Sequence, residues 1–406
     1  MNNEQKIASA LSATPIALSA DPGVKTGQAA PGPDETWQLP GGTAWVYYGQ
    51  NNQMLTRPVL LADGFNSGPS KLDDLYEGLE RKAFPLISSL RRRGRDVVII
   101  GYDDRSASIF TNAQAVTAAV FRAIAERIGS TRLMVGGFSM GGLVTRYALA
   151  RMEMQRMDHQ TGVYFSWDTP HRGAYVPISL QAFAHYIKDL DSAFSDQMNS
   201  PAARQMLAWH LEAWDGVPGV DPLRTEFLQQ LQQVGGWPRI PRLLGIADGA
   251  GDGTGNGIAA GATAVLGTGA TISGTDLRTQ PKAPDTLAAR LRVGGDVEEV
   301  HAPDVPPVDG APGGTMNGFE VLADVLNSLP AEYGMAVDNP IAGHCFVPSI
   351  SSTAIRDITE KDLYLDIDSL SPDESDLDDF LCASTNGGHT EITEEAAYWL
   401  IDRLPD

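Results

Sequence analysis

The chain has 406 residues, of which 42% are hydrophobic and 20% are charged, and its formal net charge is −21. This length suits one large domain with insertions or two smaller domains. The acidic balance argues against binding nucleic acid or an anionic membrane through a basic patch, and it favours a neutral or apolar ligand over an anionic one. No apolar run in the sequence is long enough to span a bilayer.

The first 36 residues are rich in Ala, Ser, Gly and Pro, and we expect them to form a poorly ordered leader. The segment 1–20 contains a lysine, a glutamate and several other polar residues, a pattern unlike that of a signal peptide. We therefore expect a soluble protein, and the pattern favours a cytoplasmic location over a secreted mature form.

Strands and helices alternate through residues 37–173. Apolar runs predict strands and amphipathic runs predict helices: strands at 43–48, 58–62, 96–100, 133–135 and 162–167, and helices at 72–93 and 111–128. Such alternation is typical of a mostly parallel sheet that is covered by helices on both faces. The predicted fold class is therefore α/β.

The stretch 131–150 is the one around which the chain is organised. Its pentapeptide 137–141, Gly-Phe-Ser-Met-Gly, fits the pattern G-x-S-x-G, and apolar residues recur at helical spacing after it. A serine between a buried strand and a helix projects from a sharp turn, where the glycines allow the two backbones to approach. The helix N-terminus behind it favours developing negative charge. We interpret Ser139 as a nucleophile on this turn rather than as part of a chance Gly-rich loop.

With this motif, residues 58–172 and the segment around His389 resemble the α/β-hydrolase superfamily, on its lipase and esterase side. The resemblance implies the α/β-hydrolase fold and a catalytic triad in the chain order serine, acid, histidine. It also implies an acyl-enzyme mechanism that needs neither a cofactor nor a metal ion.

The remaining residues divide into four segments in this interpretation. Helical patterns with aromatic residues such as Phe183 and Trp209 follow the strands and predict a helical cap over the active site at 174–236. A core strand is expected at 237–248 and a Gly- and Pro-rich β appendage at 249–312. Residues 313–406 complete the hydrolase core with a last strand, the histidine loop and a closing helix.

His389 is the predicted base, because it lies in a Gly-rich loop between the last strand and the closing helix, where the superfamily places its histidine. Serine needs such a base to become a good nucleophile. The other histidines after the cap are His301, in the predicted appendage, and His344, at the start of a strand-like run. Neither has this context.

Three aspartates are candidates for the acid, which must accept a hydrogen bond from the imidazole. Asp168 and Asp248 each end a predicted strand, and Asp252 lies in the Gly-rich loop that follows. Most members of the superfamily use the position of Asp248, whereas pancreatic-type lipases use the earlier one. The short, Pro170-stiffened loop of Asp168 favours that residue.

Two backbone N–H groups are needed to hold the oxyanion. The resemblance assigns them to Met140, which follows the nucleophile, and to Phe65, in the loop after an early strand. This loop begins with Asp63-Gly64, so aspartate replaces the histidine that lipases usually have there.

The sequence thus predicts a serine hydrolase of carboxylic esters, acting on a small-molecule, lipid-like or polymeric ester. An acyltransferase or a thioesterase with the same triad is an alternative, as is a non-catalytic binding relative, which would be expected to lack a triad member. The two cysteines, Cys345 and Cys382, are either free thiols or a disulfide that joins the segments flanking His389.

Overall fold

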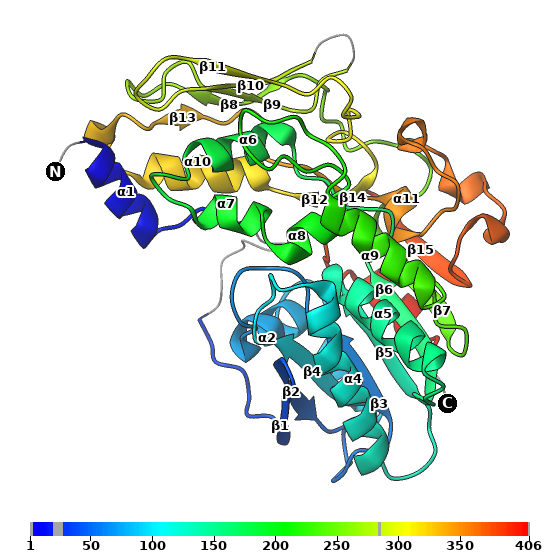
Figure 1. Cartoon of the computed structure of the whole chain (residues 1–406). Coiled ribbons are helices and arrows are strands. Elements are labelled where there is room, and N and C mark those ends of the chain that lie inside the picture. The colour runs from blue at the N-terminus through cyan, green and yellow to red at the C-terminus, as the bar shows by residue number, and fades with distance from the viewer. Residues whose placement is uncertain (1–2, 19–26, 283–285, 405–406) are drawn as a thin grey trace.

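The computed structural model describes residues 3–18, 27–282 and 286–404 (Figure 1). Its centre is an eight-stranded sheet with the order β1-β2-β4-β3-β5-β6-β7-β15. β1 and β2 form an antiparallel hairpin and β2 pairs antiparallel with β4, whereas all later neighbours are parallel. The strands are β1 Glu35–Leu39, β2 Gly42–Tyr47, β3 Pro58–Ala62, β4 Asp96–Tyr102, β5 Leu133–Phe138, β6 Thr161–Trp167, β7 Arg242–Ala250 and β15 Asp379–Ala383.

Helices cover both faces of this sheet. α4 Ile109–Glu126 and α5 Met140–Met154 share one apolar cluster with the sheet, and α2 Leu72–Glu80, α3 Leu86–Arg92 and α12 Glu394–Ile401 share another. Every residue of β3, β4 and β5 is buried, as expected for parallel strands with helices on both sides. The strand order and these crossovers define the α/β-hydrolase fold, which confirms the predicted fold class.

A second lobe lies over one end of the sheet (Figure 1). Its strands form a five-stranded antiparallel sheet, β11-β10-β9-β8-β13. Its elements are α6 Ile178–Tyr186, α7 Ala193–Met198, α8 Pro201–Met206, α10 Gly318–Ser328, β8 Thr263–Gly267, β9 Asp276–Arg278, β10 Leu287–Leu291, β11 Glu298–His301 and β13 Val337–Asp338. Apolar residues of these helices and strands form one cluster. The segments expected as a cap at 174–236 and an appendage at 249–312 therefore pack together, because the small sheet buries its apolar face against the helices.

The remaining elements connect the lobe to the main sheet. β12 pairs antiparallel with β14, and α9 packs on the main core through Phe227 and Leu231. These elements are α9 Pro222–Gln233, β12 Gly313–Met316, β14 His344–Pro348, α11 Ser349–Ser352 and the 3-10 turns Ala331–Tyr333, Glu360–Asp362, Ile367–Ser369 and Pro372–Glu374. Among the described residues, the helices are all too short or too polar to cross a membrane.

The N-terminal region differs from the expected leader at 1–36. Helix α1, Asn3–Ala13, buries Ile7 and Leu11 against the lobe, and β1 begins at Glu35, ahead of the first strand that the sequence predicts. Residues 1–2 and 19–26 of the leader lie outside the described residues. Two apolar residues four positions apart lie on the same face of a helix, and they dock α1 although its other residues are small or polar.

The structure decides between the two cysteine alternatives and places two aromatic residues of the predicted cap. Cys345 and Cys382 are free thiols, so the disulfide alternative is wrong. Phe183, one of the aromatic residues of the predicted cap, is fully buried in the lobe. Trp209 packs against the same cluster.

Candidate active site

Ser139 occupies the turn between β5 and α5. Its backbone angles are φ 53° and ψ −122°, a conformation that costs a non-glycine residue roughly 1–3 kcal/mol. The close packing explains the flanking glycines, since a Cβ on Gly137 would lie 2.4 Å from the Gly141 carbonyl carbon, and one on Gly141 would lie 2.4 Å from the Ala62 oxygen. The turn therefore presents the Ser139 hydroxyl at the N-terminus of α5, above the carboxyl end of β5.

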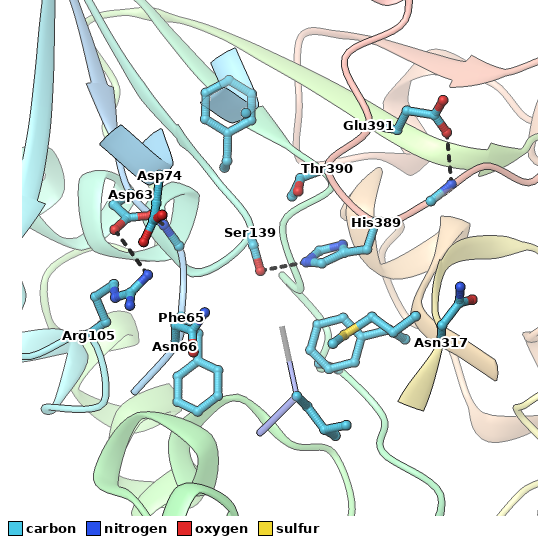
Figure 2. Close-up of a pocket in the computed structure, with 18 of the residues that line it drawn as sticks. Asp63, Phe65, Asn66, Asp74, Arg105, Ser139, Asn317, His389, Thr390 and Glu391 are labelled. Atoms are coloured by element: carbon cyan, nitrogen blue, oxygen red, sulfur yellow. Dashed lines mark hydrogen bonds and ion pairs between the residues drawn. The ribbon is translucent and has the colours of Figure 1, made fainter. Parts of the chain in front are cut away.

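A continuous chain of hydrogen bonds runs from this hydroxyl through His389 to Asp168. The Ser139 Oγ lies 2.7 Å from His389 Nε2, and His389 Nδ1 lies 2.6 Å from Asp168 Oδ2. All three side chains are buried. Since His389 Nδ1–H donates to the carboxylate, Nε2 is left as the acceptor for the Ser139 hydroxyl. Figure 2 shows the side chains of Ser139 and His389 facing one another.

Asp168 is held in place from several directions at the end of β6. Its Oδ1 accepts hydrogen bonds from the Ser352 hydroxyl at 2.7 Å and from the Asp248 N–H at 3.2 Å. Its φ of 43° turns the chain sharply out of the strand. Gly314 leaves room for the carboxylate, because a Cβ there would lie 1.8 Å from Asp168 Oδ2. These constraints orient the carboxylate toward His389.

The other two acid candidates are placed differently. Asp248, near the end of β7, accepts at Oδ1 from Trp167 Nε1–H at 3.1 Å, and its buried Oδ2 has no hydrogen-bond partner among the described residues. Burial, together with the charge of Asp168, raises the pKa of Asp248 well above its ordinary value and so favours its neutral form. Asp252 is exposed and accepts from the Thr254 N–H in the following loop. Only Asp168 is hydrogen-bonded to the imidazole.

The loop that carries His389 is joined to β12. The His389 N–H donates to the Thr315 carbonyl at 2.8 Å, while the N–H and hydroxyl of Thr315 both donate to the Gly387 carbonyl. The ring of Phe346 lies edge-on to the imidazole, with centroids 4.8 Å apart. The backbone and ring contacts together fix the height and tilt of the imidazole above Ser139.

The loop after β3 passes directly over the nucleophile. A Cβ on Gly64 would lie 3.3 Å from the Phe138 oxygen and 3.4 Å from the Ser139 Cβ, so the backbone that follows runs beside the hydroxyl. In Figure 2, Phe65 and His389 lie on opposite sides of Ser139. The Met140 N–H belongs to the first turn of α5, where N–H groups have no partner inside the helix.

Asp63 braces this loop at the position where a histidine is usual in lipases. Its Oδ1 accepts from the Gly64 N–H and its Oδ2 from the Ser70 hydroxyl, each at 2.6 Å, and Arg105 lies 4.0 Å away. The Ser70 hydroxyl in turn accepts from the Tyr102 N–H at 2.8 Å. The carboxylate therefore connects the loop to the end of β4, which explains how the departure from the lipase pattern is accommodated.

Ser139 and His389 open into a cavity of about 770 Å³, within the range of small-molecule sites. The lobe and the N-terminal segment contribute apolar side chains to it: Leu18, Ala174, Val176, Met198, Ala203, Met206, Leu207 and Phe346. The charged side chains of its lining are mostly carboxylates: Asp63, Asp74, Glu77, Glu320, Asp324 and Glu391, with Lys82 and Arg105. A neutral ligand with an apolar portion matches this lining. Among the described residues there is no group of His, Cys, Asp or Glu that could hold a metal ion.

His171, in the Thr-Pro-His segment after β6, is part of the structure beneath the site. Its Nε2 lies 2.9 Å from the Ser166 hydroxyl, its Nδ1 lies 3.3 Å from Arg146 Nη1, and its ring lies against Trp237. Burial and the adjacent guanidinium lower the pKa of His171 well below its ordinary value, so the ring is neutral. A neutral ring can accept from Arg146 while it donates to Ser166.

Sequence reasoning did not identify Gly314, Thr315 and Ser352 as site residues. Their places against Asp168 and the His389 loop follow from the pairing of β12 with β14 and from α11, which ends at Ser352. No motif surrounds these residues, and they act on partners between 72 and 184 positions away in the chain. The Pro-Gly-Gly-Thr run at 312–315 is the sole local signal, and it indicates only a close backbone approach.

No protein-family model and no curated protein matches the sequence. Solved structures that resemble it include Est1E from Butyrivibrio proteoclasticus, at 17% identity and a TM-score of 0.31, over 50% of this chain and 72% of that one. The mature form of the Bacillus licheniformis lipase BlEst2 is 12% identical, with a TM-score of 0.31 over 51% and 72%. Esterase B from Lactobacillus Rhamnosis is 14% identical, with a TM-score of 0.33 over 56% and 69%.

The chain's own strand order and its strained serine turn define its class, an α/β-hydrolase-fold protein with serine, histidine and aspartate hydrogen-bonded at the sheet edge.

Proposed function

We propose that the protein is a serine hydrolase that cleaves carboxylic esters, with Ser139 as the nucleophile, His389 as the base and Asp168 as the acid. The observation that carries this proposal is the unbroken hydrogen-bonded chain among the three side chains, of which Ser139 and His389 line the cavity. A non-catalytic binding protein would need neither the strained backbone at Ser139 nor hydrogen bonds at both ring nitrogens of His389.

The first half of the reaction forms an acyl-enzyme. Ser139 Oγ attacks the ester carbonyl carbon while its proton passes to His389 Nε2, and Asp168 stabilises the imidazolium through Nδ1–H. The carbonyl oxygen becomes an oxyanion, which accepts hydrogen bonds from the Phe65 and Met140 N–H groups. The bond to the alcohol oxygen then breaks, and the departing alcohol takes the proton from Nε2.

The second half releases the acid. A water molecule gives a proton to His389 Nε2 and attacks the acyl carbon, and the same two N–H groups hold the second oxyanion. The Ser139 Oγ then leaves and recovers its proton from Nε2. The products are a carboxylic acid and an alcohol, and each proton transfer uses groups of this chain, the ester or water.

The cavity lining supports an uncharged ester with an apolar acyl group as the substrate, either a small lipid-like ester or a segment of a polyester. The lobe supplies apolar side chains on which an alkyl chain can be buried, at about 0.8 kcal/mol per methylene. Carboxylates such as Glu320, Asp324 and Glu391 in the lining disfavour an anionic substrate.

Labelling with a fluorophosphonate, combined with hydrolysis of a p-nitrophenyl ester series from acetate to decanoate, tests the proposal. We expect rapid labelling of the native protein at one serine, and Ser139→Ala should abolish labelling and lower kcat at least about a thousandfold. Ser89→Ala, which changes a buried serine on α3 that does not line the cavity, is the matched control and should behave like the native protein. A native protein that is neither labelled nor active would instead be the non-catalytic binding relative.

A further inference from the structure

The N-terminal segment 3–18 belongs to the lobe that lies over the site. Ile7, Leu11, Ile16 and Leu18 are all buried in the same apolar cluster as the lobe helices and the five-stranded sheet. α1 alone, with 11 residues, is too short to be stable in water without such packing. The segment is thus fixed to the lobe by its apolar side chains.

Gln197, on α7, holds the end of this segment with two hydrogen bonds. The Leu18 N–H donates to Gln197 Oε1, and Gln197 Nε2 donates to the Leu18 carbonyl, both at 2.8 Å. All of these atoms are buried away from solvent, where an unpaired backbone group is costly. Because the Leu18 N–H and carbonyl are both paired with the Gln197 amide, the backbone at Leu18 is fixed in orientation as well as in position.

Leu18 lines the same cavity as Ser139 and His389. The lining also includes Met198, at the end of α7, and Met206, at the end of α8, and Met198 belongs to the same apolar cluster as Leu18. The part of the lining that α7 and α8 supply has no charged side chain, whereas α2 contributes Asp74 and Glu77 beside its leucines, and α10 contributes Glu320 and Asp324 beside its valine. An alkyl chain that extends from a carbonyl at Ser139 is therefore best accommodated along the α7–α8 side, where Leu18 lies.

We infer that Leu18 is a specificity-determining residue, and that the N-terminal segment, held by Gln197, sets the length of the acyl chain that the site accepts. This inference rests on the proposed esterase function. Leu18 is fixed by hydrogen bonds to its backbone and by burial of its own segment, so its side chain forms a firm part of the wall. A single methylene in such a pocket changes discrimination by about 10- to 200-fold.

The test compares kcat/KM for p-nitrophenyl acetate, butyrate and decanoate in four variants: Leu18→Trp, Ser12→Trp, Gln197→Leu and the double variant that combines Leu18→Trp with Gln197→Leu. Leu18→Trp places a larger side chain in the wall, and we expect it to lower the decanoate-to-acetate ratio at least about tenfold, because a long acyl chain needs space that a short one leaves empty. Ser12→Trp is the matched control, because it adds the same bulk to an exposed residue of the same segment. It should leave the ratio unchanged.

Gln197→Leu removes both hydrogen bonds to the Leu18 backbone at similar side-chain size. This variant tests whether these hydrogen bonds hold Leu18 in the wall. We expect weaker discrimination among the three esters, and the effect of Leu18→Trp should be smaller in the Gln197→Leu background than in the native one, since coupled residues are not additive. Additive effects would show that Gln197 does not hold Leu18 in the wall. If Leu18→Trp fails to fold, Leu18→Phe takes its place.

The outcomes separate this inference from the proposed function. An unchanged decanoate-to-acetate ratio in a folded Leu18→Trp that reacts normally with fluorophosphonate overturns the inference and leaves the esterase proposal standing. A native protein without labelling or turnover overturns the esterase proposal. In that case, binding of the unreactive ketone dodecan-2-one decides the role of Leu18: weaker binding to Leu18→Trp supports it as a wall residue, and equal binding rejects it.

Discussion

Asp168 and Asp248 stand at the ends of the adjacent parallel strands β6 and β7, and the backbone N–H of Asp248 donates to the side-chain Oδ1 of Asp168. The two carboxyl groups have different environments. Asp168 accepts from Ser352 and His389, whereas Asp248 accepts from Trp167 and is favoured in its neutral form by burial and by the charge of Asp168. One fold position thus carries the acid of the proposed triad, and the other carries a carboxyl group that does not compete for the imidazole.

The different environments predict different consequences for two equivalent substitutions. Asp168→Asn should lower kcat by about three to four orders of magnitude, because an amide in place of the carboxylate favours the wrong imidazole tautomer. Asp248→Asn should cost less than about tenfold, since the amide oxygen can still accept from Trp167 Nε1–H and no charge is lost. Steady-state hydrolysis and the rate of fluorophosphonate labelling measure both effects. Equal losses in the two variants would contradict the assignment of the acid.

Gly314 should be intolerant of any side chain. In Gly314→Ala, the new Cβ would overlap Asp168 Oδ2, so the carboxylate must move away from His389. We expect kcat to fall about a hundredfold or more in a protein that keeps its circular dichroism spectrum. Gly295→Ala is the control, because a Cβ at Gly295 meets nothing within 4 Å. A fully active Gly314→Ala would show that the carboxylate position is not critical.

Residues of the lobe should divide into those that support the fold and those that contact the acyl chain. Phe183 is fully buried and does not line the cavity, so Phe183→Ala should lower the free energy of unfolding by about 3–5 kcal/mol without changing acyl preference. Met206 lines the cavity, so Met206→Ala should change the decanoate-to-acetate ratio. Urea unfolding and the ester series distinguish the two roles. An altered acyl preference in Phe183→Ala would place that residue in the substrate site.

Stability should respond to pH through Asp309, which precedes β12. Burial raises the pKa of its carboxyl group from 3.8 to about 7, and only one of its oxygens has a partner, the Gln280 N–H at 2.6 Å, among the described residues. The folded protein therefore retains this proton between pH 4 and pH 7, where the unfolded chain loses it. The contribution of Asp309 to stability is present at low pH and falls as pH rises through this window, by about 1.4 kcal/mol per unit.

Asp309→Asn removes this pH dependence. The free energy of unfolding of the variant, relative to that of the native protein, should therefore rise by about 4 kcal/mol as the pH increases from 4 to 7. Urea unfolding of both proteins at several pH values gives the difference directly. The buried histidines His185 and His344, whose pKa values are lowered to about 4 by burial, act in both proteins and cancel in the comparison. A difference that does not vary with pH would mean that Asp309 is ionised in the folded state.

Local patterns determined the parts of this protein that depend on neighbours in the sequence. The apolar runs and helical spacing predicted the parallel core, and the pentapeptide around Ser139 predicted the serine turn, because strand, glycine and helix must follow one another within a few residues to make it. The position of His389 followed from the strand before it and the helix after it. These expectations depended on contacts within a few residues, which the sequence displays directly.

Only the tertiary structure decided what depends on distant contacts. The sequence left both Asp168 and Asp248 open as the acid, with a preference for Asp168 from its short loop. The hydrogen bond between Asp168 and His389 depends on Ser352, Gly314 and the loop around Thr315, which long-range pairing brings to β6. The leader was expected to be poorly ordered because it is rich in Ala, Ser, Gly and Pro, yet Ile7 and Leu11 pack against the lobe. Composition describes what a segment can bury by itself, whereas packing depends on the surface that the rest of the chain offers it.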